Sequence, residues 1–580
     1  MRSFFKIFFA SLLSLIVFAL IMLFVMVGYI GGKSIIKVQA NSVLVIDLGQ
    51  HYAEQLKDNP LSIVSSSESD IPGLYDVIRL LRKAKTDKNI AGVYLIANSN
   101  PNGFASSDEI RTALIDFKTS GKFVIAHGDV ISQKAYSVAN IADSIYASPQ
   151  GYLEWTGFSV TYAFLKGTLE KLEIQPQIFY AGKFKSATEP LRAEKMTPEN
   201  QLQTSVWLND IYDHFLMETA TARKTDTATL HQLANDGAIQ TAADAVKYKL
   251  LDALKYDDEV KDGFKRRLHI DKYEKINFIT INTYLEANKY ESKSGEKIAL
   301  IFAEGDIVDG KSDQGSIGSD TYRNLIRKAR LDKSIKAIVF RVNSGGGSSL
   351  ASENIWRELE LAKKEKPVVV SFGDVAASGG YYISCGADSI FAEPLTITGS
   401  IGVFGIIPNM ENFFKNKLGV TFDGVKTATY GDLGNISRPL NDNEKKMVQA
   451  SIEVIYTQFK QRVADGRKKD TAYVDSIAQG RVWTGIRAKD IGLIDRFGGI
   501  DDAIKAAATL AKLTEYQVRE FPEPEGFFAK WFGKSEPAIV NQKIEAEMGT
   551  ENYQIYQEVK RIKEMSGGAQ VRLPFKFFIH

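Results

Sequence analysis

Residues 336–372 read KAIVFRVNSGGGSSLASENIWRELELAKKEKPVVVSF, and they contain one complete strand–helix–strand unit. Lys336–Val342 is an apolar run rich in β-branched residues, which predicts a buried strand. Ser352–Lys364 has the spacing of a helix, and Pro367–Phe372 predicts a second strand. Continuous apolar strands that alternate with helices imply an α/β fold with a mainly parallel sheet.

The same alternation continues on both sides of this unit. Lys297–Ala303 predicts a strand before it, and Thr321–Arg330 has helical spacing. After it, Ser378–Gly386 predicts a helix and Ser389–Ala392 a short strand. The sequence therefore predicts a whole α/β domain around the quoted stretch.

An internal repeat organises most of the chain. When the sequence is shifted by 245 positions, residues 84–157 fall without a gap on residues 329–402, and the identical motifs include Gly-Asp-Val and Ala-Asp-Ser-Ile. A chain of 580 residues is also too long for one compact core. We therefore expect two copies of one domain, at 41–290 and 297–520.

The two ends of the chain lie outside the repeat. Ile7–Ile30 is almost wholly apolar, and at about 1.5 Å per residue such a helix spans a bilayer core. Basic residues before the run favour a cytoplasmic N-terminus, so we expect residues 1–32 to be a single transmembrane anchor. A cleaved signal peptide, with a site near Val38-Gln39-Ala40, and a buried core helix are the alternatives. The tail, 521–580, has no counterpart in the repeat and no assigned role, although Glu536–Met565 has a helical pattern.

Composition excludes several classes of function. The formal net charge is only +2, so the chain has no basic excess to neutralise the phosphates of a nucleic acid. The single cysteine, Cys385, excludes a disulfide within the chain and a multi-cysteine metal site. The sequence also has no HExxH-type motif, and we expect no metal and no organic cofactor.

The two copies differ where chemistry is expected. The second copy carries Gly345-Gly346-Gly347 after a strand, and such residues let backbone N–H groups approach a ligand closely. The alternative is a flexible turn. Ser378 lies between small residues at a strand-to-helix turn, where the helix N-terminus favours a developing oxyanion. The first copy has Gln133 at the position of this serine. The alternative role for Ser378 is that of a helix N-cap.

A nucleophilic serine needs a base. The sequence has no histidine between His269 and His580, which excludes a Ser-His-Asp triad inside the second copy except through His580. The first copy offers Lys185, and the second has Gly434 at the aligned position. A lysine buried between domains has a depressed pKa and acts as a neutral base. We interpret the nearby Lys183 and Lys195 as solvated surface charges.

These motifs resemble the signal peptide peptidase A family of bacterial membrane peptidases in its long, tandem-domain form. The resemblance runs from the apolar N-terminus to about residue 520, and its motifs are Gly182–Pro190, Ala377–Tyr381, Thr398–Gly402 and Gly480–Gly485. One departure is Gly345, where the family usually has proline, and it implies a more flexible start to the oxyanion hole.

The resemblance assigns roles to individual residues. It implies that Ser378 is the nucleophile, that Lys185 is the general base, and that Ser400 hydrogen-bonds and orients the lysine. Backbone N–H groups of Gly379 and of either Gly346 or Gly347 would form the oxyanion hole.

The resemblance also implies a fold, an assembly and a location. The fold would be two crotonase-like or Clp-peptidase-like domains, and the assembly a homotetramer. The protein would be a single-pass protein of the bacterial inner membrane, with its catalytic part on the extracytoplasmic side, and its substrates would be signal peptides left after export. The alternatives are a non-catalytic scaffold that binds hydrophobic peptides and an acyl-CoA hydratase-like enzyme. The presence of both Ser378 and Lys185 argues against each of them.

Overall fold

The computed structural model describes residues 2–31, 37–56, 71–288, 295–313, 315–523 and 569–573. Helix α1, Arg2–Gly31, precedes the two repeats, and its side chains are described only for Phe4–Phe18 and Ile21, which are exposed. The predicted anchor at 1–32 thus lies partly outside the described residues. Among the described residues, we find no helix with the length and apolar character needed to cross a membrane.

The first repeat contains a wholly parallel sheet in the order β6-β4-β3-β2-β1-β7. Its strands are β1 Ser42–Asp47, β2 Ile90–Ile96, β3 Phe123–Ile131, β4 Ser144–Leu153, β6 Ala253–Leu254 and β7 Phe278–Thr280. The helices of this repeat are α2 Leu74–Thr86, α3 Phe104–Lys118, α4 Gln133–Ala139, α5 Lys166–Lys171, a 3-10 turn at Ser186–Thr188, α6 Glu189–Arg192, α7 Pro198–Arg223, α8 Thr227–Asn235, α9 Ala242–Lys247, α10 Asp257–Leu268 and α11 Ile281–Ala287.

The second repeat copies this topology strand by strand. The path β18-β14-β13-β11-β8-β19 has the same parallel order, and β15 and β17 extend the sheet beyond β13. The strands are β8 Lys297–Glu304, β11 Ile335–Ser344, β13 Val368–Ala377, β14 Ser389–Ala392, β15 Ile397–Gly399, β17 Val482–Thr484, β18 Arg496–Phe497 and β19 Gln517–Phe521. The helices are α12 Ser319–Leu331, α13 Ser349–Lys363, α14 Gly379–Ser384, a π-helix at Phe413–Lys417, α15 Asp442–Arg467, α16 Thr471–Ile477, α17 Gly485–Asp490 and α18 Ile500–Leu510. The predicted α/β class with two tandem domains is confirmed.

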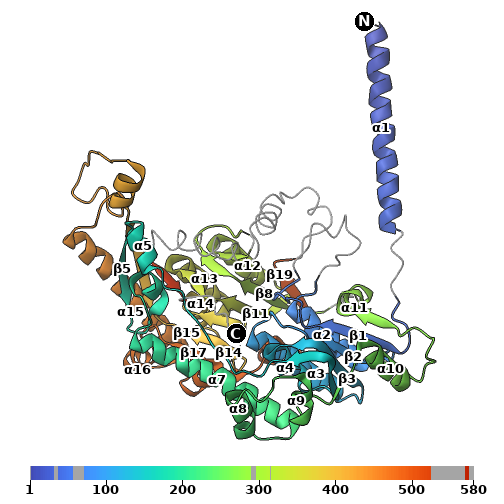
Figure 1. Cartoon of the computed structure of the whole chain (residues 1–580). Coiled ribbons are helices and arrows are strands. Elements are labelled where there is room, and N and C mark those ends of the chain that lie inside the picture. The colour runs from blue at the N-terminus through green and yellow to red at the C-terminus, as the bar shows by residue number, and fades with distance from the viewer. Residues whose placement is uncertain are drawn as a thin grey trace.

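A third sheet joins distant parts of the chain in the order β10-β9-β12-β20-β16-β5. Its strands are β5 Gln175–Ala181, β9 Asp306–Val308, β10 Ser316–Gly318, β12 Gly346–Ser348, β16 Val403–Asn409 and β20 Gln570–Arg572. In Figure 1, β5 lies at the left beside α15, whereas the main sheet of its own repeat lies at the right.

The alternative of a flexible turn at the glycine run is wrong, because two of the three glycines, Gly346 and Gly347, belong to strand β12. The helix predicted at Glu536–Met565 in the C-terminal tail lies outside the described residues.

The two repeats share a buried boundary. One continuous apolar core contains first-repeat residues together with Leu300, Val339 and Ile504 of the second repeat. At this boundary Arg341 has no exposed surface, and it pairs with Glu54 at 2.7 Å and Glu109 at 2.5 Å, both from the first repeat. Because a buried guanidinium needs opposite charge and hydrogen-bond acceptors, this triad fixes how the repeats dock.

Candidate active site

Ser378 occupies a strained turn between β13 and α14. Its φ is 53° and its ψ is −113°, a conformation that non-glycine residues rarely adopt. Its backbone N–H donates to the Gly399 carbonyl at 2.8 Å, and its side chain makes no capping bond to α14. The N-cap alternative is therefore wrong, and the hydroxyl is left for another partner.

Lys185 reaches the second repeat through a strand pair between the repeats. Strand β5 pairs antiparallel with β16, and the last pair of the register is Ala181 with Val403. The chain then turns at Gly182, where φ is +103° and a Cβ would lie 2.5 Å from the carbonyl carbon of Gln479. Glycine is required at such a close approach. The turn directs Lys185 back towards β13.

The lysine amine meets both predicted serines. Lys185 Nζ lies 2.9 Å from Ser378 Oγ and 3.0 Å from Ser400 Oγ, and it donates to the Ser400 carbonyl at 3.2 Å. Lys185 is 1% exposed, and both serines are completely buried. Burial lowers the pKa of the Lys185 amine well below its usual range. In contrast, Lys183 and Lys195 are exposed in the structure.

The position of Ser400 follows from the sheet. Strands β13 and β15 end side by side, with Ala377 opposite Gly399, so the residues that follow them emerge together. Ser400 has a φ of 49°, and its N–H donates to the Arg481 carbonyl at 2.7 Å. This turn aims both the carbonyl and the hydroxyl of Ser400 at the lysine amine.

The glycine strand lies directly beside Ser378. Gly346 has a φ of +99°, and a Cβ on it would lie 2.6 Å from the Gly379 nitrogen. The Gly346 N–H donates to Ser344 Oγ at 3.1 Å, so of the two predicted alternatives it is Gly346 whose N–H already has a side-chain acceptor. Gly345 lies between β11 and β12, and its carbonyl accepts from the Leu573 N–H at 2.6 Å.

Two further residues position the lysine. Gln203 on α7 is 2% exposed, and its amide donates to the Phe184 carbonyl at 3.1 Å and accepts from the Val482 N–H at 3.2 Å. Gly480 has a φ of +74°, and a Cβ there would lie 2.7 Å from the Lys185 nitrogen. The sequence offered a signal for Gly480, because this glycine opens the Gly480–Gly485 motif. Gln203 gave none, because it looks like any polar helix residue.

The corresponding place in the first repeat is filled. The Gln133 side chain is buried, accepts from the Thr156 and Gly157 N–H groups at 3.0 and 2.9 Å, and donates to the Gly157 carbonyl at 2.9 Å. Gly434, the counterpart of Lys185, lies on an exposed segment with a φ of +87°. The first repeat thus has no nucleophile at this position, and the second has no amine.

A cluster of Asp108, His214 and Glu218 lies elsewhere, in the first repeat. His214 Nε2 lies 3.5 Å from Asp108 Oδ2 and 3.4 Å from Glu218 Oε1, and Arg111 pairs with Glu218 at 2.7 Å. Burial lowers the pKa of His214, but the hydrogen bonds and charges of the two carboxylates outweigh burial and raise this pKa to about 10. Two cationic side chains therefore already balance the two carboxylates, and the cluster is an ion-pair network.

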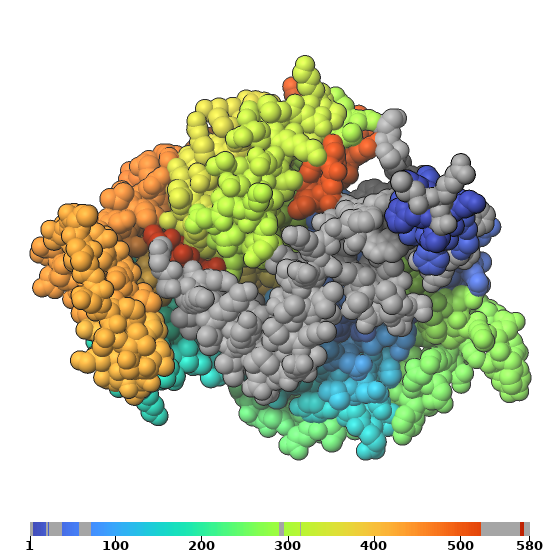
Figure 2. Space-filling model, turned by 90° about the horizontal axis from the view of Figure 1, so that it is seen from above, coloured from blue at the N-terminus to red at the C-terminus, as the bar shows by residue number. Residues whose placement is uncertain are grey.

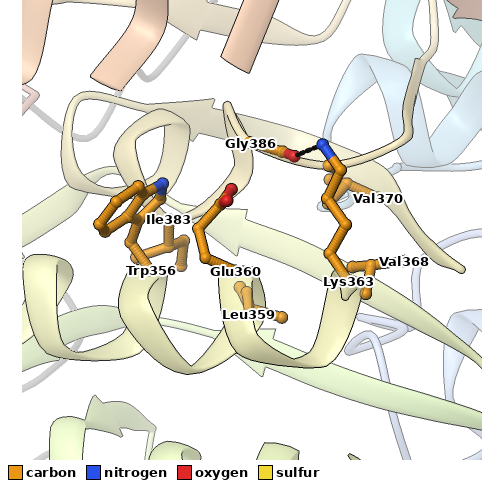
Figure 3. A pocket seen from close by; sticks show the side chains of 9 residues that line it. Trp356, Leu359, Glu360, Lys363, Val368, Val370, Ile383 and Gly386 are labelled. Atoms are coloured by element: carbon orange, nitrogen blue, oxygen red, sulfur yellow. Dashed lines mark hydrogen bonds between the residues drawn. The ribbon is translucent and has the colours of Figure 1, made fainter. Parts of the chain in front are cut away.

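A small pocket under α13 is also separate from the contact between Ser378 and Lys185. Figure 3 shows that Trp356, Glu360 and Lys363 line it, and that Lys363 Nζ donates to the Gly386 carbonyl at 2.7 Å. Its space of about 10 Å³ is about that of one water molecule. The pocket is too small for a peptide.

Comparison with known proteins matches both repeats. The family model Peptidase family S49 matches residues 116–271 and 360–514. Protease 4 of Salmonella typhi is 40% identical over 463 residues, which cover 78% of this chain and 74% of that protein. Protease 4 of Haemophilus influenzae is 32% identical, covering 88% and 85%, and the chloroplastic serine protease SPPA of Arabidopsis thaliana is 33% identical, covering 82% and 70%.

Proposed function

Since the chain belongs to peptidase family S49 and is a serine protease, we propose that Ser378 is its nucleophile and Lys185 its general base. The observation that carries this proposal is the 2.9 Å contact between the two side chains. A scaffold and a hydratase-like enzyme are disfavoured, because the family is one of peptidases.

The amine geometry suits proton abstraction from the serine. A neutral amine has two N–H donors and one lone pair, and the Ser400 carbonyl and hydroxyl take the two donors. The lone pair then points at Ser378 Oγ and accepts its proton. Ser400 thereby acts as the positioning residue for the base.

The reaction follows from this arrangement. Ser378 Oγ attacks the peptide carbonyl while its proton passes to Lys185 Nζ. The N–H groups of Gly379 and Gly347 stabilise the tetrahedral oxyanion. Lys185 then gives the proton to the leaving amine, and later removes a proton from the water that hydrolyses the acyl-enzyme. The side chains of the dyad complete this cycle without a cofactor.

We also propose a location and a substrate class. The exposed apolar side chains of α1, Phe4 to Phe18, support a single-pass anchor in the bacterial inner membrane, with both repeats on the extracytoplasmic side. Hydrophobic peptides in or near the membrane, such as cleaved signal peptides, are then the proposed substrates. We also propose that the protein assembles as a homotetramer and that its two domains are crotonase-like or Clp-peptidase-like. Detergent-dependent release of the protein from washed membranes tests the anchor, and release by salt alone would contradict it.

The dyad is tested by a matched pair of lysine substitutions. Lys185→Met should abolish hydrolysis of a fluorogenic apolar peptide and labelling by a fluorophosphonate, because the serine loses its base. Lys183→Met, two residues away and exposed, should leave both intact. Ser378→Ala should remove the label and leave only residual turnover. Near-normal turnover by Ser378→Ala or Lys185→Met would refute the assignment.

A further inference from the structure

Lysines gather at the point where the chain enters the first repeat. Lys37 lies six positions after Gly31, the last residue of α1, so the chain holds it within about 20 Å of the end of that helix. An open polar pocket of about 570 Å³ lies beside it, and Lys83 and Lys88 line this pocket together with Lys37. All three lysines are exposed. Three ammonium groups therefore lie close to the end of α1.

Strand β1 begins between two loops that carry such lysines. The Ser42 N–H donates to the Asn89 carbonyl at 2.8 Å, and the Val43 N–H donates to the Asn277 carbonyl at 2.9 Å. Each loop is thereby fixed within about one strand spacing, about 4.8 Å, of the incoming chain. The second loop lies between α10 and α11. Figure 2 shows the green atoms of these two helices at the right-hand end of the molecule, where Figure 1 shows the start of β1.

The second loop adds two lysines and an aromatic side chain. Lys272 and Lys275 are exposed, and Tyr273 between them is 84% exposed. Lys272 Nζ lies 4.8 Å from the centre of the Tyr273 ring. Tyrosine is enriched at the level of lipid headgroups, and lysine is attracted to anionic headgroups. We call the five lysines of this region the entry lysines: Lys37, Lys83, Lys88, Lys272 and Lys275.

The entry lysines have no carboxylate partner within the part of the chain that the structure describes. One carboxylate, that of Asp87, lines the pocket. It accepts from the Asn89 N–H and from the Tyr284 hydroxyl, both at 2.9 Å. The pocket therefore has three cations to one carboxylate, and that carboxylate already has two donors.

The same corner of the second repeat provides a contrast. Lys328 falls on Lys83 at the shift of 245 positions, and it pairs with Glu523 at 3.2 Å. Lys333, the counterpart of Lys88, is exposed. The lysine at the end of the first helix is thus ion-paired in the repeat that is remote from α1 along the chain, whereas its counterpart next to α1 is left for an external anion.

We propose that the entry lysines bind the phosphate groups of anionic lipids, and so hold the first repeat against the membrane in which α1 is anchored. This inference rests on the proposed anchor. Anionic headgroups attract lysines that lie within about one Debye length, about 8 Å, of the bilayer surface. Contacts from both loops fix the orientation of the repeat on this surface, whereas a single tether would leave it free to rotate.

Acetylation of the full chain in vesicles tests this surface. The protein is reconstituted in vesicles of phosphatidylcholine, with or without phosphatidylglycerol, and treated with the uncharged reagent acetic anhydride. Mass spectrometry of its peptides then gives the rate at each lysine. Lys83, Lys88, Lys272 and Lys275 should react about fivefold more slowly in the anionic vesicles, the factor that corresponds to the attraction of one lysine to such a surface. Lys333 should react equally in both.

Salt and inorganic phosphate identify the kind of contact. At an ionic strength of about 1 M the Debye length is about 3 Å, so the protection should disappear, and protection that survives would overturn an electrostatic contact. Inorganic phosphate added to phosphatidylcholine vesicles should leave the rates unchanged. Equal protection by inorganic phosphate would identify a site for small anions and overturn the assignment to lipids.

Matched variants test the role of the pocket. Lys83→Gln combined with Lys88→Gln should restore fast acetylation of Lys272 and Lys275 in anionic vesicles, because fewer charges hold the repeat at the surface. Lys333→Gln should leave their protection intact. Both variants should hydrolyse a fluorogenic peptide at the wild-type rate. Unchanged protection in the double variant would contradict a surface that includes the pocket.

The outcomes separate this inference from the proposed anchor. If detergent is needed to release the protein from membranes, but Lys83, Lys88, Lys272 and Lys275 react alike in the two kinds of vesicle, the lipid proposal is wrong and the anchor stands. If salt alone releases the protein, the anchor and the lipid proposal fail together.

Discussion

At the residue scale, the central feature is a buried lysine whose amine lies between two serine hydroxyls. The described residues place no carboxylate against Lys185, and burial alone lowers its pKa. A group of this kind binds fewer protons in the folded than in the unfolded chain, so it makes stability rise with pH until the unfolded amine also loses its proton. Near neutral pH the buried amine therefore lowers the stability of the fold.

The pH dependence of turnover follows from the same pKa. If the neutral amine is the base, as proposed, kcat/KM should fall as the pH is lowered through the depressed pKa of Lys185. The profile should show one acid limb that belongs to the free enzyme. A kcat/KM that stays constant while the pH falls far below neutrality would contradict a lysine base.

The stability of the lysine variant is a second consequence. Lys185→Met replaces a buried amine by an apolar chain of similar length, so the inactive variant should melt at a higher temperature near neutral pH. The shift is about 2–4 °C for each kcal/mol gained in a domain of this size. Calorimetry of the two proteins measures it, with exposed Lys183→Met as the control, and a lower melting temperature would show that the amine stabilises the fold.

At the element scale, the site depends on the meeting of two glycine-bearing turns. The turn after β5 carries Lys185, and the turn before β17 carries Gly480, whose α-carbon has no room for a side chain against the Lys185 backbone. The antiparallel pairing of β5 with β16 brings the first of these turns to the second repeat. A displacement of about 1 Å at such a contact costs roughly 100-fold in rate.

This close approach predicts the effect of one methyl group. Gly480→Ala should lower kcat by about 100-fold, because its Cβ would lie 2.7 Å from the Lys185 nitrogen. Gly419→Ala is the matched control, since Gly419 also has a positive φ, +66°, but nothing lies within 4 Å of its Cβ position. Steady-state kinetics compares the two variants, and equal losses would show that backbone strain, not crowding of Lys185, is responsible.

At the scale of the whole molecule, the dyad exists only where the repeats are docked. Lys185 and Ser378 come from different repeats, and the Arg341 triad and the shared apolar core hold these repeats together. The first-repeat counterpart of Ser378 is a buried glutamine, so neither repeat alone contains both groups.

The triad predicts a large change in stability. Arg341→Met leaves Glu54 and Glu109 buried without their cation, and should lower the free energy of unfolding by about 3–5 kcal/mol. Arg357→Met, at an exposed position on α13, should change it by less than about 0.5 kcal/mol. Urea unfolding followed by circular dichroism measures both. Equal stability of the two variants would mean that the triad does not hold the boundary.

The sequence by itself determined the α/β class and the two copies of the domain. It also singled out Ser378 and Lys185 as the candidate catalytic residues. Apolar runs and helical spacing are local properties, and comparison of the copies singled out Ser378 against Gln133 and Lys185 against Gly434. Only the tertiary structure decided that these side chains, 193 positions apart in the chain, meet. It also decided that the Gly346 N–H donates to Ser344 Oγ. It placed the Gln203 amide against the Phe184 carbonyl, next to the lysine. It alone also placed strand β20 between β12 and β16. The physical reason is that periodicity reveals which face of an element is buried, but the partner of that face is selected by packing and strand pairing between distant segments.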